Sequence, residues 1–256
     1  MKTFYAFFKK EQLEMLRTGR LLVLIILFAL FGIMNPAIAK LTPWMLQSLS
    51  GSMAESGIII TNIAVNALTS WTQFYKNLPI ALLIFVLMTS AIFTAEYQKG
   101  TLVLVLTKGL KRTKILAAKA LTLLVVWTGL YYLCYFITLG YTAFYWDNGI
   151  AQHVGLAAGL YLLFGIWVLS VMVLCSAPAS ANTGVLLGTG GAVLAVYLLG
   201  LLPNVAPYLP LYLTQSMSLL TGTLAPGAMA RAAGVTVGLI AANTAAAVLL
   251  FQKRSL

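Results

Sequence analysis

Very few side chains in this sequence could carry out chemistry by themselves. The 256 residues contain one histidine, two cysteines (Cys134 and Cys175) and five acidic residues. The histidine, His153, stands outside any H-E-x-x-H pattern, so a zinc protease is not expected. The GTGG run at residues 188–191 is not followed by G-K-[ST], so the chain is not expected to bind ATP itself. We predict no catalytic residue and no metal site.

Residues 95–119 carry the most informative pattern, and its chemistry is that of binding rather than catalysis. The stretch reads AEYQKGTLVLVLTKGLKRTKILAAK, with Glu96 at its start, an apolar run at 101–106 and a basic cluster at 108–114. Six apolar residues are too few to cross a bilayer, so they must bury against something else. A groove on another protein and the protein's own helix ends are both suitable partners. The pattern leaves both interpretations open.

The elements that position this stretch follow from an apolar composition. Hydrophobic residues make up 61% of the chain and charged residues only 8%, with a mean hydropathy of +0.95. This excludes a soluble enzyme, a disordered chain and a secreted disulfide scaffold. A membrane span needs about 20 mostly apolar residues. Six stretches qualify, at about 21–39, 78–95, 117–138, 153–174, 183–202 and 232–251. We predict one all-α, polytopic transmembrane domain over residues 1–256.

The basic residues indicate the orientation of these spans. An even number of spans places both termini on one side, and thirteen of the 16 Lys and Arg residues then share that side. The positive-inside rule makes this side cytoplasmic, so the charge excess reflects topology and not nucleic-acid binding. We expect spans without charged side chains and assign Lys119 to the inner segment. Asn35, Asn243 and Thr244 are then expected to bond neighbouring helices.

Residues 1–20 and the two long outer segments complete the map. Phe4, Phe7, Phe8 and Met15 share one helical face, and Lys9, Lys10, Glu14 and Arg17 lie largely opposite, although Glu11 and Leu13 interrupt the pattern. We predict an amphipathic interfacial helix on the inner membrane surface, where Lys9, Lys10 and Arg17 contact lipid or a partner. The outer segments after the first and fifth spans are expected to form short helices over the outer face, as a gate or a passive cap.

The inner segment resembles the type-2 ABC transporter permease family. The matching pattern is E-x-x-x-G-T, an apolar run, then R and K, carried here by Glu96, Gly100, Thr101, Leu102–Leu106, Arg112 and Lys119. A K-x-E start with a following Arg, at Lys9, Glu11 and Arg17, resembles the family as well. Six spans, the chain length and internal termini agree, so the resemblance covers essentially the whole chain.

The resemblance implies a coupling helix within the cytoplasmic loop 96–116 that sits in a cleft of a separate ATP-binding subunit. The implied contact residues are Glu96, Lys99, Gly100, Thr101, Leu102, Val105, Leu106 and Arg112, with Glu96 at the start of the helix. Lys108, Lys111 and Lys114 are expected to meet either acidic residues of that partner or lipid phosphates.

The implied function is that of the membrane subunit of an ABC exporter in the cell membrane. ATP and Mg²⁺ would be bound by the partner subunit, and a second permease copy, identical or paralogous, would complete the assembly. A non-transporting membrane protein, such as an immunity factor or a sensor, is the alternative. An ion-coupled secondary carrier is disfavoured because the spans lack charge.

Overall fold

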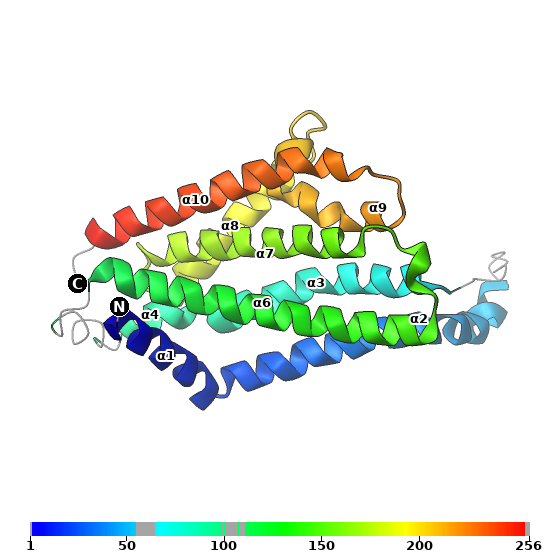
Figure 1. Cartoon of the computed structure of the whole chain (residues 1–256), viewed down its shortest axis with the longest axis horizontal. Coiled ribbons are helices and arrows are strands. Elements are labelled where there is room, and N and C mark those ends of the chain that lie inside the picture. The colour runs from blue at the N-terminus through cyan, green and yellow to red at the C-terminus, as the bar shows by residue number, and fades with distance from the viewer. Residues whose placement is uncertain (1, 55–64, 99, 101–106, 108–110, 254–256) are drawn as a thin grey trace.

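The protein is a bundle of long helices, seen in a computed structural model that describes residues 2–54, 65–98, 100, 107 and 111–253 (Figure 1). No strand occurs in these ranges. Both ends of the chain, the start of α6 and the short helix α4 gather at one end of the bundle, which we call the terminal end. The six predicted spans are confirmed as six helices long and apolar enough to cross a membrane.

The spans are longer than the hydropathy pattern predicts at several ends. The corresponding helices are α2 (Arg20–Ala54), α3 (Ala67–Thr89) with α4 (Ala91–Gln98), α6 (Arg112–Tyr145), α7 (Val154–Ser176), α8 (Asn182–Leu199) and α10 (Ala230–Lys253). The largest differences are at the end of α2 and at the start of α3, where Asn66 and Thr69 form a reciprocal capping box. The polar residues that follow are accommodated by partners, since Ser70 and Thr142 share a hydrogen bond of 2.7 Å.

Helix α2 continues through Pro36, where a helix would ordinarily lose a hydrogen bond. A proline leaves the carbonyl four residues earlier without its backbone donor, and here that carbonyl belongs to Gly32. The Thr138 hydroxyl of α6 donates to Gly32 O at 3.1 Å and accepts from Asn35 Nδ2 at 3.0 Å. Asn77 of α3 in turn donates to Asn35 Oδ1 at 2.8 Å. The expectation that Asn35 bonds neighbouring helices is confirmed, and so is that for Asn243, which donates to Ser170 of α7.

The core lies where α3, α6 and α7 meet, and it is largely aromatic. Trp71, Phe74, Trp127, Tyr131 and Tyr161 are all buried, with ring centroids of successive neighbours 5.6–6.5 Å apart. A side chain at Gly165 of α7 would collide with the Trp127 ring, so the two helices approach closely there.

Short helices join α8 to α10, as predicted for the segment after the fifth span, and α9 lies near the end opposite the termini (Figure 1). These are η2 (Ala206–Tyr208), η3 (Pro210–Gln215), α9 (Ser216–Leu220) and η4 (Pro226–Met229), with η1 (Asn148–Ile150) after α6. Leu213, Leu219 and Leu220 are fully buried, so η3 and α9 pack firmly on the bundle.

Helix α1 (Lys2–Arg17) differs from the predicted interfacial helix in what its apolar face contacts. Phe7 and Met15 belong to the protein core, with 7% and 6% exposure, because α1 packs against α6. Glu11 lies between them on the same face and is also buried, whereas Leu13 is exposed. The helix ends at Arg17, and the chain then turns at Gly19, whose φ of +71° favours glycine. Part of the apolar face of α1 is therefore covered by the protein's own helices.

Candidate functional site

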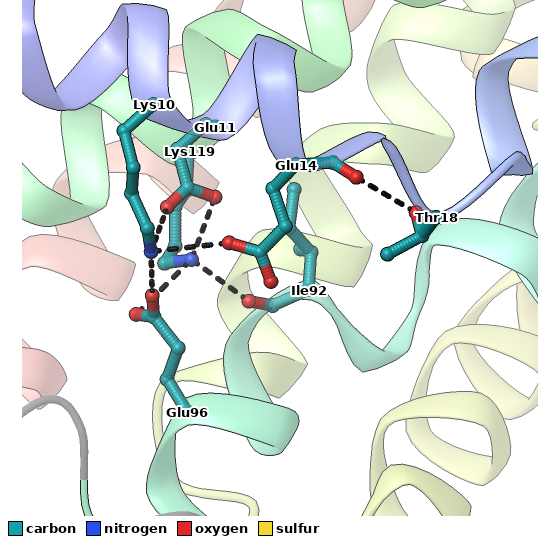
Figure 2. Close-up of polar contacts among 7 residues, drawn as sticks. All are labelled: Lys10, Glu11, Glu14, Thr18, Ile92, Glu96 and Lys119. Atoms are coloured by element: carbon teal, nitrogen blue, oxygen red, sulfur yellow. Dashed lines mark hydrogen bonds and ion pairs between the residues drawn. The ribbon is translucent and has the colours of Figure 1, made fainter. Parts of the chain in front are cut away.

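Three of the chain's five acidic residues converge at the terminal end, around two lysines (Figure 2). Glu11 and Glu14 come from α1, Glu96 from the last turn of α4, and Lys119 from α6. Lys10 of α1 completes the group, which we call the ion-pair cluster. It joins three helices that are distant in sequence, directly beside the loop 99–111.

Lys119 is the buried centre of the cluster. It lies about two turns inside α6 and only 1% of it is exposed. Its ammonium donates to Glu11 Oε2 at 2.8 Å and to Ile92 O at 2.9 Å, and it lies 3.2 Å from Glu96 Oε2. Two hydrogen-bond acceptors and the nearby Glu96 carboxylate thus surround the ammonium. The structure places Lys119 within the first turns of α6, where these partners allow the charge to lie in an apolar helix.

Lys10 closes the cluster on its exposed side. Its ammonium lies 2.6 Å from Glu96 Oε1, 3.2 Å from Glu11 Oε1 and 3.1 Å from Glu14 Oε2. Partial burial by itself would lower the pKa of Lys10, but the hydrogen bond that Lys10 donates to Glu96 and the charges of Glu11 and Glu96 outweigh it, so the pKa is raised. Lys10 therefore remains charged at physiological pH.

The three carboxylates could in principle hold a metal ion, because their oxygens lie within 4.8 Å of one another. The same oxygens, however, face the Lys10 and Lys119 ammonium groups at 2.6–3.2 Å. These two cations occupy the positions that a metal would take, so the arrangement is an ion-pair network.

A second set of contacts joins the start of α6 to the end of α10. Arg112 Nη1 donates to the carbonyls of Phe251 at 3.5 Å and Gln252 at 3.2 Å. Cationic side chains favour such carbonyls at a helix C-terminus. The Tyr97 ring of α4 lies 6.3 Å from the Phe251 ring. Both flanks of the loop 99–111 are therefore attached to helices of the bundle.

The predicted contact residues fall into three groups. Glu96 lies in the last turn of α4 and pairs with Lys10 and Lys119, so its predicted place at the start of a helix is wrong. Gly100 has a φ of +64°, a conformation that favours glycine at this turn. Lys99, Thr101, Leu102, Val105, Leu106 and Lys108 lie outside the described residues.

The predicted lipid or partner contacts also divide. Lys9, Arg17 and Lys111 are exposed and Lys114 is partly exposed, whereas Lys10 belongs to the ion-pair cluster.

Sequence analysis missed Glu11, Glu14 and Lys119 as site residues. One feature of the sequence could have revealed them. Glu11 interrupts the apolar face of α1, and Lys119, with the opposite charge, interrupts the apolar run of α6.

A comparison with known protein families identifies the family of this chain. The model of the ABC-2 family transporter proteins matches residues 5–256, almost the entire chain. The chain belongs to the ABC-2 family of transporter proteins. No curated protein and no solved structure gave a significant match. The resemblance seen in the inner segment is confirmed.

Membership of the ABC-2 family fixes the broad function. The chain is a multi-pass membrane protein and a permease of an ABC transporter. Permeases of this family are membrane transport components and are generally not catalytic themselves. The ion-pair cluster offers a means of holding helices together.

Proposed function

We propose that this chain is the membrane subunit of an ATP-driven exporter and that it couples ATP hydrolysis on a separate subunit to substrate translocation. The ATP-binding subunit contacts the loop 99–111 from the cytoplasm and carries ATP and Mg²⁺. Two permease copies form the pathway in the cell membrane, with both termini cytoplasmic. Thirteen of 16 cations on one side support this orientation.

The attachment of the loop's flanks is the observation that supports coupling best. Before the loop, Glu96 is bound to α1 and α6 through Lys10 and Lys119. After the loop, Arg112 is bound to the end of α10. Closure of two ATP-binding subunits is a rigid-body motion. A partner that displaces the loop would therefore displace α1, α4, α6 and α10 together.

The charges within the spans support an external energy source. Lys119 and Glu96 are the charged side chains found buried in the described spans, and they pair with each other near the terminal end. Ion-coupled carriers usually place such groups in mid-membrane, facing a pathway. A largely apolar pathway suits a lipid-like, amphipathic or peptide substrate.

Co-purification with the ATP-binding subunit tests the proposal. The chain is co-expressed with a soluble protein that carries G-x-x-x-x-G-K-[ST] and is encoded beside it. We expect a stable complex whose ATPase activity depends on the permease, and we expect Leu102→Asp with Leu106→Asp to abolish both. Leu13→Asp with Leu16→Asp is the matched control, since both leucines are exposed on α1.

Two results would contradict the proposal. An unchanged complex and ATPase activity in the Leu102→Asp, Leu106→Asp variant would exclude the loop as the contact. Substrate movement by the purified chain alone, driven by an ion gradient without ATP, would favour a secondary carrier.

A further inference from the structure

An open apolar groove of about 390 Å³ lies on the outward surface of α6. Its walls are Phe136, Ile137, Tyr141 and Phe144, and Gly140 forms its floor. Phe136 and Phe144 are 61% and 80% exposed, and a side chain at Gly140 would meet no atom within 4 Å. The described residues of the chain therefore leave this surface uncovered.

The groove lies at a defined depth, because α2 runs alongside this half of α6 (Figure 1). Gly32 packs on Ile137, and Asn35 donates to Thr138, so this part of α2 is level with the inner end of the groove. Phe136 and Phe144 are eight residues apart, a distance of about 12 Å along a helix. The groove therefore extends from within the apolar bundle to the end opposite the termini.

A positively charged side chain, that of Lys40, lies at the outer end of the groove. Lys40 Nζ of α2 lies 3.8 Å from the centroid of the Tyr145 ring. Tyr145 stacks on Tyr141 at 6.5 Å and contacts Phe144 edge to face at 5.1 Å, so Lys40 lies one helical turn beyond the groove on the same face. Among the described residues, no acidic side chain pairs with Lys40.

We propose that the groove binds one anionic phospholipid of the bilayer, with an acyl chain along Phe136–Phe144 and the phosphate beside Lys40. The apolar walls match an acyl chain, and the ammonium supplies the charge that a phosphate requires. Tyr145 and Trp146 lie at this level, where aromatic residues favour the interface between headgroups and hydrocarbon. An apolar helix from another protein would fill the groove but would leave Lys40 without an anion.

Native mass spectrometry of the purified chain tests the site. The protein is reconstituted in nanodiscs of phosphatidylglycerol and phosphatidylcholine in equal amounts, and the lipid retained after partial delipidation is counted. We expect wild type to retain phosphatidylglycerol with about fivefold preference, the effect of one cation near the surface. Lys40→Gln should reduce this preference to about one, whereas Lys40→Arg should keep it.

Two further variants distinguish lipid binding in this groove from the general effect of removing a lysine. Lys76→Gln removes another exposed lysine, which pairs with no acidic side chain in the described part of the chain, and should leave the preference unchanged. Gly140→Leu fills the groove and should abolish retention of both lipids, with thermal melting to verify the fold. An undiminished preference in Lys40→Gln would overturn the proposal. So would a Gly140→Leu variant that dissociates a dimer without changing lipid retention, because the groove would then be an interface between chains.

Discussion

Lys119 and Glu11 show how a single pair of residues can decide where a helix lies. Each interrupts an apolar face, and each would be costly to bury alone. Together, with an ammonium–carboxylate distance of 2.8 Å and 1% and 3% exposure, they join α1 to α6. Such a pair adds little net stability compared with apolar residues, but it strongly penalises the loss of either partner.

Replacement of Lys119 by methionine should therefore be severely destabilising. Glu11 and Glu96 would remain buried without the central cation, at a cost of about 3–5 kcal/mol in the free energy of unfolding. Thermal melting in detergent measures this loss. Lys114→Met, a lysine on the same helix outside the cluster, is the control and should change stability by less than about 0.5 kcal/mol. Equal effects of the two substitutions would contradict the structural role of Lys119.

Lys10 gives the cluster a pH dependence of known sign. Its pKa is raised above the ordinary 10.5 by Glu96 and Glu11, against the opposing effect of burial. A raised folded-state pKa stabilises the protein below the unfolded value and loses that effect as pH rises through the folded value. The difference in melting temperature between wild type and Lys10→Gln should thus be constant from pH 7 to 10 and shrink above 10.5. A difference that grows with pH would contradict this assignment.

At the scale of elements, α2 illustrates how one helix is completed by its neighbour. Pro36 cannot supply the backbone N–H for Gly32 O, and Thr138 of α6 supplies a hydroxyl in its place. The interruption in α2 is thereby converted into a specific contact between helices.

A double-mutant cycle tests this exchange of donors. Thr138→Val should cost about 1 kcal/mol in the wild type, the usual value for a hydrogen bond between membrane helices. In a Pro36→Ala background the restored backbone N–H can bond Gly32 O, so the same substitution should cost less. Thermal melting of all four proteins gives the coupling energy. Identical costs in both backgrounds would show that Thr138 does not serve Gly32.

The sequence predicts the existence of the six helices well, because long apolar runs have few other solutions in a membrane. It fails at the start of α3, where Ser70 and Asn77 look like surface residues until their partners on α6 and α2 are known. It fails at the ion-pair cluster for the same reason. Glu11 and Lys119 are 108 positions apart, and periodicity reports on one helix at a time.

At the scale of the whole molecule, both termini lie at one end and η1 at the other (Figure 1). The distribution of cations supports our proposal that the terminal end is cytoplasmic. In a background with Cys134→Ala and Cys175→Ala, we expect a membrane-impermeant thiol reagent applied outside cells to label Ile150→Cys. Lys253→Cys should be labelled only after the membrane is opened. Both positions are exposed, so the reverse pattern would establish the inverted orientation.

The ion-pair cluster also sets an order of events during synthesis. Glu11 and Glu14 leave the ribosome early, but Lys119, the buried counter-ion of Glu11, follows more than a hundred residues later. Because chains are made from the N-terminus, α1 cannot dock in its final place until α2 and α3 are already inserted and α6 has begun. The N-terminal helix is thus among the first segments made and among the later ones assembled.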